Sequence, residues 1–159
     1  MSQTTEQARE HRFIINHRVA FGHDGDKYGW TGGGSIIDDD VSGRTAWFVQ
    51  KASRAFTETL PPHSNLTVIL YCRVRSPGST LKATHSGGTY YSTSEMVTTQ
   101  MSTYWVRNAK ADAAGKFWID FETDNGQSLR IHQIEVMGPV TATDTPESLG
   151  MEILGEVVS

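Results

Sequence analysis

Cysteine is almost absent from this 159-residue chain, which contains only Cys72. A single cysteine cannot form a disulfide within the chain, and it cannot supply the thiolates of a structural zinc site. The residues two positions away, Leu70 and Val74, are apolar. We therefore expect Cys72 to be a packed thiol and not a reactive one.

Positive charge and long apolar runs are also scarce. Lys and Arg number 14 against 18 Asp and Glu, which gives a net charge of −4. Binding to nucleic acid needs a basic face, so we expect no nucleic-acid partner. No stretch approaches the roughly 20 apolar residues of a membrane span, and residues 1–10 lack the apolar centre of a signal peptide. We expect no membrane partner, and export by assembly or lysis if the protein leaves the cell.

Motifs of catalytic and cofactor sites are missing as well. The glycines at 32–34 are not followed by the Gly-Lys-Ser/Thr of a phosphate-binding loop. No serine lies in the context of a nucleophile elbow. His11, His17 and His23 are six residues apart, which favours surface histidines over metal ligands. The sequence therefore predicts no enzyme activity, no cofactor and no metal.

What recurs is alternation of apolar and polar residues in short segments. In Thr67–Arg75 the apolar residues Val68, Leu70, Cys72 and Val74 would face one way, as expected for a half-buried strand. The segments with this pattern are Arg44–Gln50, Thr67–Arg75, Thr80–His85, Thr103–Arg107, Lys116–Glu122 and Ser128–Val136. Turn-forming residues separate them, as in Asp124–Gly126. Seven or eight short strands of this kind indicate a β-sandwich or barrel.

The order of these segments resembles carbohydrate-binding modules of the galactose-binding-like jelly-roll type. The resemblance covers residues 13–137 and rests on seven segments: Phe13–Asn16, Gly29–Asp38, Gly43–Phe48, Phe56–Pro61, Leu66–Ser76, Gly115–Phe121 and Leu129–Val136. It implies an all-β fold, an antiparallel jelly-roll β-sandwich. Residues 1–12 would then form an N-terminal arm and residues 138–159 a C-terminal arm.

The chain departs from that family where many members hold a structural calcium ion. The positions of the acidic ligands are occupied by Arg18, Ala20 and His132. These side chains cannot replace hard oxygen ligands, so we expect no calcium at the usual place. Carboxylates that could build a calcium site elsewhere are those of Asp24, Asp26 and Asp38–Asp40. Acidic residues in glycine-rich loops are, however, more often plain turn residues.

Modules of this type bind sugars with aromatic faces and nearby polar groups. Alternation places Trp47, Tyr71 and Trp118 outward, together with Arg73 and Asp120. If their strands share a sheet, these five residues form a ligand-binding platform. The alternative is that an arm or a neighbouring subunit covers them.

Two functions follow from these features. In the first, the chain is a non-catalytic bacteriophage virion protein, a capsid decoration (cement) or tail-associated protein. It would be located in the virion and bind capsid or tail proteins, as a homo-oligomer and with glycans as further ligands. In the second, it is a carbohydrate-binding module of a larger secreted, glycan-active protein. The arms would serve assembly in the first function, and the aromatic platform would serve sugar binding in the second.

Overall fold

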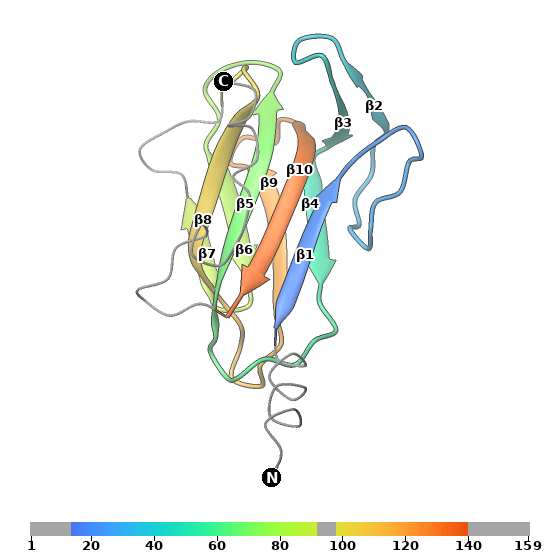
Figure 1. Cartoon of the computed structure of the whole chain (residues 1–159). Helices are drawn as coiled ribbons and strands as arrows, with labels where there is room; N and C mark the ends of the chain where they lie inside the picture. The colour runs from blue at the N-terminus through green and yellow to red at the C-terminus, as the bar shows by residue number, and fades with distance from the viewer. Residues whose placement is uncertain (1–13, 92–97, 140–159) are drawn as a thin grey trace.

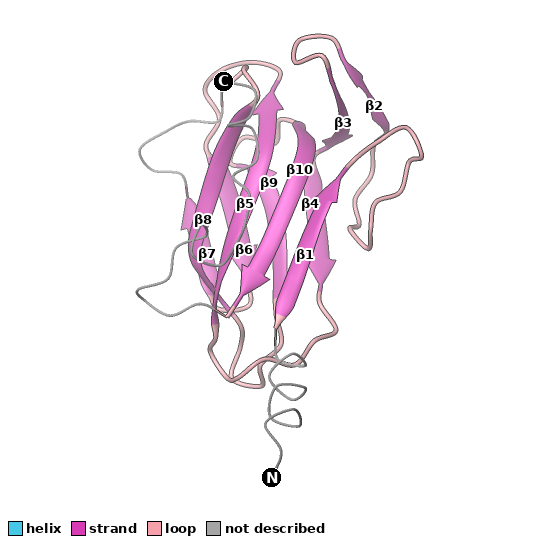
Figure 2. Ribbon diagram, in the orientation of Figure 1, coloured by secondary structure: helices cyan, strands magenta, loops and turns pink. Residues whose placement is uncertain are grey.

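The computed structural model describes residues 14–91 and 98–139 of the chain. In this part the chain forms β-strands joined by loops, without a helix, and the strands make two antiparallel sheets (Figures 1 and 2). The strands are β1 (Ile15–Ala20), β2 (Ile36–Asp39), β3 (Arg44–Val49), β4 (Lys51–Ala55), β5 (Asn65–Val74), β6 (Leu81–His85), β7 (Gly88–Tyr91), β8 (Ser102–Lys110), β9 (Trp118–Thr123) and β10 (Leu129–Gly138).

The larger sheet is built around β10. On one side β10 pairs with β5, and β8 lies beyond β5. On the other side β10 pairs first with β3 and then, from Gln133 onward, with β1, while β2 forms the edge beyond β3. The smaller sheet has the order β4-β9-β6-β7. Two antiparallel sheets in this order form a jelly-roll β-sandwich, as the sequence predicted.

The core fills the space between the two sheets. On β5 the predicted inward residues Val68, Leu70, Cys72 and Val74 have no exposed surface. Facing strand β9 contributes side chains such as Phe121 to the same cluster. The burial of apolar area between the layers is what drives two sheets of this kind together. The predicted alternation of β5 is thus confirmed.

Cys72 lies within this core. Its thiol is free and wholly buried, and burial raises the pKa of the thiol far above its usual range. A thiol held in its neutral form is a poor nucleophile. The prediction of a packed, unreactive cysteine is confirmed.

Within the described residues no helix is long and apolar enough to cross a membrane.

His17 corrects one sequence prediction, because it is not a surface histidine. Trp30 Nε1 donates a hydrogen bond to His17 Nε2 at 3.0 Å. The imidazole also meets the ring of Phe56 edge-on, with the centroids 5.3 Å apart. Burial, and then the positive charge of Arg54, lower the pKa of His17 from 6.5 to about 4.

This low pKa predicts a loss of stability in mild acid. Between pH 6.5 and 4 the unfolded chain binds a proton at residue 17 and the folded chain does not, so the free energy of unfolding falls as pH falls through this interval. We expect His17 to account for about 1–2 kcal/mol of the fall. Urea unfolding at pH 7 and pH 4.5 measures it. In His17→Gln, which keeps an acceptor for Trp30, the fall should be smaller by that amount; an equal fall would contradict this assignment.

Candidate functional site

The outer face of the smaller sheet carries a row of polar side chains and one exposed indole. Alternation turns the core residues of β4, β9 and β6 inward and their neighbours outward. The outward residues, which we call the β9 face, are Lys51, Ser53, Ala55, Lys82, Thr84, Trp118, Asp120 and Glu122. Because a sheet holds them in register, their relative positions are fixed.

Trp118 begins β9 and lies opposite Ala55 on β4. Its backbone is held on the other side by Ser86, whose N–H donates to the carbonyl of Trp118 at 3.1 Å. The small side chain of Ala55 leaves the indole uncovered, and Trp118 is 38 % exposed. Among the large hydrophobic side chains of residues 14–91 and 98–139 that are exposed, it is the one aromatic.

Asp120 lies two residues further along β9, between Ser53 on β4 and Thr84 on β6. Lys51 Nζ is 3.6 Å from Asp120 Oδ2 and 3.8 Å from Glu122 Oε2. The ion pairs are open to solvent, so they stabilise the fold little. They do provide carboxylate acceptors, hydroxyls and an ammonium group within reach of one another beside Trp118.

A hollow of about 460 Å³ opens at the β4 edge of this face. The loop between β1 and β2 closes it, because Thr31 and Ser53 exchange backbone hydrogen bonds of 2.7 and 2.9 Å. Arg54 is fixed at its rim: Nη1 donates to the carbonyl of Tyr28 at 2.9 Å, and the guanidinium lies 4.4 Å from the centroid of the Phe56 ring. The lining residues are Gly29, Thr31, Ser53, Arg54, Ala55, Trp118 and Asp120. Its volume is within the range of small-ligand sites.

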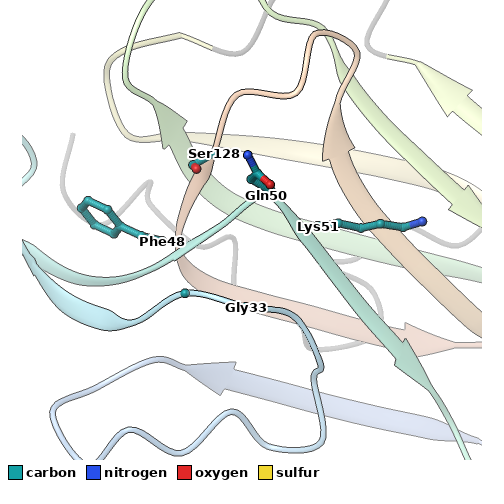
Figure 3. Close-up of a pocket in the computed structure, with 6 residues that line it drawn as sticks. Gly33, Phe48, Gln50, Lys51 and Ser128 are labelled. Carbon is teal, nitrogen blue, oxygen red and sulfur yellow. The ribbon is translucent and has the colours of Figure 1, made fainter.

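Two further hollows lie next to each other at the end of the sandwich where β3 passes into β4. The first measures about 390 Å³ and is drawn in Figure 3, where the Gln50 carboxamide lies beside Ser128 while Phe48 and Lys51 point in opposite directions. The second measures about 560 Å³ and shares Ser128 with the first.

The predicted platform of five residues is wrong as a single surface, and Trp47 shows why. Trp47 is wholly buried in the core, with its ring centroid 5.2 Å from that of Phe21. The outward residue of β3 is Phe48, over whose ring the Arg130 guanidinium lies. The alternation along β3 was therefore assigned one residue out of phase, which exchanges the two faces of a strand.

Tyr71 and Arg73 do point outward from β5, but from the other sheet. They are only 3 % and 5 % exposed. Arg73 forms a buried ion pair with Asp39, and the Arg44 guanidinium lies 5.5 Å from the centroid of the Tyr71 ring. The contacts of these two side chains are with Asp39 and Arg44 of the same domain, whereas cover by an arm or a neighbouring subunit stays a prediction. Trp118 and Asp120 are the two predicted residues that the structure brings together on one accessible face.

The sequence analysis missed the residues that flank this pair. Ser53 lies in a short polar strand that was not predicted, Thr84 lies in the predicted strand Thr80–His85 but was not singled out, and Thr31 comes from a loop. Their position beside Asp120 is set by the pairing of strands that are distant in the sequence. No pattern within each segment could therefore predict it. The described ranges contain no group of three His, Cys, Asp or Glu arranged for a metal ion. Of the positions expected to lack calcium ligands, Arg18 forms an ion pair of 3.0 Å with Glu135.

Comparisons with known proteins agree on the architecture. No family model matches the sequence, and no curated protein matches it. The solved structures include the CBM22-1 xylan-binding domain of Xyn10C from Paenibacillus barcinonensis, with a TM-score of 0.59, 15 % identity, and coverage of 82 % of this chain and 98 % of that one. The tandem CBM22-1-CBM22-2 structure of the same enzyme gives a TM-score of 0.56 at 15 % identity, covering 82 % and 46 %.

A larger structure also matches over part of its length. The CBM22-1-GH10 modules of Xyn10B from Clostridium thermocellum, complexed with xylohexaose, give a TM-score of 0.59 at 11 % identity. The match covers 82 % of this chain but only 30 % of that one. At these identities the likeness concerns the fold. The chain has the jelly-roll fold of carbohydrate-binding modules.

Proposed function

We propose that this chain is a non-catalytic module that binds a polysaccharide on the β9 face. The observation that carries the proposal is the exposed indole of Trp118 on the same face as Asp120, beside a hollow of about 460 Å³. The sheet register fixes the backbone positions of both residues before any ligand arrives. A preformed site loses little conformational entropy on binding.

The chemistry of the face suits a sugar. One side of a pyranose ring presents C–H groups that pack on an aromatic ring, while its hydroxyls need hydrogen-bond partners. Trp118 offers the first kind of contact. Asp120, Ser53 and Thr84 offer the second within one strand spacing on either side.

The similar structures support a polysaccharide as the ligand, since one is named a xylan-binding domain and another is a complex with xylohexaose. We assign no catalytic role to Asp120 and Glu122. Lys51 bridges both carboxylates as part of a surface ion-pair network.

Replacing Trp118 with Ala tests the proposal. Loss of the aromatic contact should weaken binding to a retained polysaccharide by about 1–3 kcal/mol, or roughly 5–150-fold. Affinity electrophoresis in gels containing xylan and other neutral polysaccharides measures the retention. Val41→Ala is the matched control, because Val41 is 58 % exposed and lies outside the β9 face. If the Trp118 variant is retained as strongly as the parent chain, the proposed function is refuted.

The finer role remains a proposal from the sequence alone. A phage decoration or tail-associated protein, located in the virion and oligomeric through its arms, would use capsid or tail proteins as partners. Those arms, residues 1–12 and 138–159, fall almost wholly outside the described residues. A module of a larger secreted glycan-active protein would use the same β9 face, so the glycan proposal is common to both roles.

A further inference from the structure

Three arginines converge on the outer face of the larger sheet, where β5 ends and β10 begins. Arg73 and Arg130 are direct cross-strand partners, and Arg75 lies in the bend just after β5, where it lines the same hollow as Arg130. Like charges placed directly opposite destabilise a sheet. Asp39 compensates one of the three charges, because both of its oxygens accept hydrogen bonds from Arg73.

Arg130 lacks such a partner. Its Nε and Nη1 are buried and form no hydrogen bond with any described residue. The guanidinium lies 4.6 Å from the centroid of the Phe48 ring, which removes water from one side. Burial, with the charges of Arg73 and Arg75 adding to it and that of Asp39 opposing it, lowers the pKa of Arg130. A desolvated cation without a counter-ion is unfavourable, so this position favours an incoming anion.

A hollow of about 560 Å³ lies beside Arg130. It is lined by Arg75, Ser76, Gln127, Ser128 and Arg130. The backbone N–H of Ser76 donates to Gln127 Oε1 at 3.1 Å, which leaves the amide nitrogen of Gln127 available as a donor. The lining thus offers two guanidiniums, two hydroxyls and an amide, and no carboxylate.

We propose that this hollow binds an oxyanion carried by an acidic polysaccharide, either the carboxylate of a uronic acid or a sulfate ester. The exposed Arg75 can offer the planar fork of its guanidinium to two oxygens of such a group at once, and Arg130 adds a second positive charge beside it. That a polysaccharide carries the oxyanion rests on the proposed function. Nucleic acid also carries oxyanions, but the net charge of −4 argues against it as the ligand. The hollow of Figure 3 adjoins this one and shares Ser128 with it.

This site is separate from the β9 face. Arg130 lies on the outer face of the larger sheet and Trp118 on that of the smaller sheet, so one can be lost without the other. The oxyanion site therefore adds a preference for charged glycans to whatever the β9 face selects.

Calorimetric titration of the full chain tests the proposal with three probes of equal length: an oligogalacturonate, its neutral methyl ester and a sulfated oligosaccharide. We expect binding of at least one charged probe and at least tenfold weaker binding of the ester. The charged probe that binds more tightly identifies the group as carboxylate or sulfate. Failure of both charged probes, or equal binding of the ester, would overturn the proposal.

Three variants make the test specific. Arg130→Gln and Arg75→Gln should each weaken the charged probe at least tenfold, and Arg75 is exposed, so its replacement leaves the core intact. Arg107→Gln removes the same charge from an exposed site on β8 and should change the affinity less than twofold; an equal loss there would show nonspecific attraction and overturn the proposal. Trp118→Ala should keep the charged-probe affinity within twofold, which separates this site from the proposed function.

Discussion

Replacing Asp39 with Asn is expected to lower the free energy of unfolding by about 3–5 kcal/mol, the effect of removing one partner of a buried ion pair. Asp39 is 2 % exposed and Arg73 5 % exposed. The distance from Arg73 Nε to Asp39 Oδ2 is 2.5 Å, and Ser42 Oγ donates to the same oxygen at 2.7 Å. The variant leaves the Arg73 guanidinium buried without a counter-charge, beside Arg130.

Urea unfolding at pH 7 measures this loss, and a double-mutant cycle shows its origin. Arg73→Met combined with Asp39→Asn removes both charges, so the double variant should be more stable than Asp39→Asn alone. Two single losses that simply add would contradict a coupled pair. The control Asp38→Asn changes the neighbouring carboxylate, which is exposed and bonded to His23 at the surface, and should shift stability by less than about 1 kcal/mol.

The same pair has a pH signature of definite sign. The hydrogen bonds from Arg73, in the first place, lower the pKa of Asp39 from 3.8 to about 2. A carboxyl with a lowered folded pKa contributes stability that is present above pH 3.8 and is lost as pH falls toward 2. This interval lies below the one assigned to His17, so the two groups can be told apart by their pH ranges.

The strands that the sequence predicted are those with large apolar residues at every second position. β5, β8, β9 and β10 are of this kind, and burial on one face dictates their period of two. β3 and β6 were also predicted, from the weaker alternation in Arg44–Gln50 and Thr80–His85. β2 and β7 escaped prediction because four residues are too few to show a period. β4 escaped because its clearest inward side chain is Ala52, whose small size gives a weak hydrophobic signal.

The candidate site could be predicted only in part, because alternation gives the face of a residue and not its neighbours. The sequence placed Trp118 and Asp120 outward on one strand, and the structure agrees. It could not show that β5 lies in the other sheet, so Tyr71 and Arg73 were added to the same platform. The pairing that separates them is a long-range property of the fold, set by the strand order around β10.

The proposed oxyanion site, in contrast, could not be predicted from any sequence motif. Arg75 and Arg130 are 55 positions apart in the sequence, and Arg130 lies in a predicted strand as an ordinary outward residue. Only the register of β5 with β10 places Arg130 opposite Arg73 and beside this hollow. A cluster of like charges without enough counter-ions then indicates a ligand that supplies the missing charge.

Replacing Gly34 with Ala is expected to destabilise the fold by about 2–4 kcal/mol, whereas Gly33→Ala should change stability by less than about 0.5 kcal/mol. Gly34 has a φ of +94°, a conformation that alanine rarely adopts, and a Cβ there would lie 1.7 Å from the carbonyl oxygen of Phe48. Gly33 lacks a positive φ and would place its Cβ in open space. The adjacent pair therefore offers a matched control within one loop.

The clash at Gly34 should also reach the β9 face. Moving the β1–β2 loop away from β3 would relieve it, and that loop holds Thr31 against Ser53 at the edge of the hollow beside Trp118. At a temperature where Gly34→Ala is still folded, we expect weaker polysaccharide retention than for Gly33→Ala, measured in the same affinity gels. If the Gly34 variant is destabilised but retains the polysaccharide fully, the loop contributes to the fold and not to binding. If both glycine variants behave as the parent chain, the close approach of Gly34 to Phe48 is refuted.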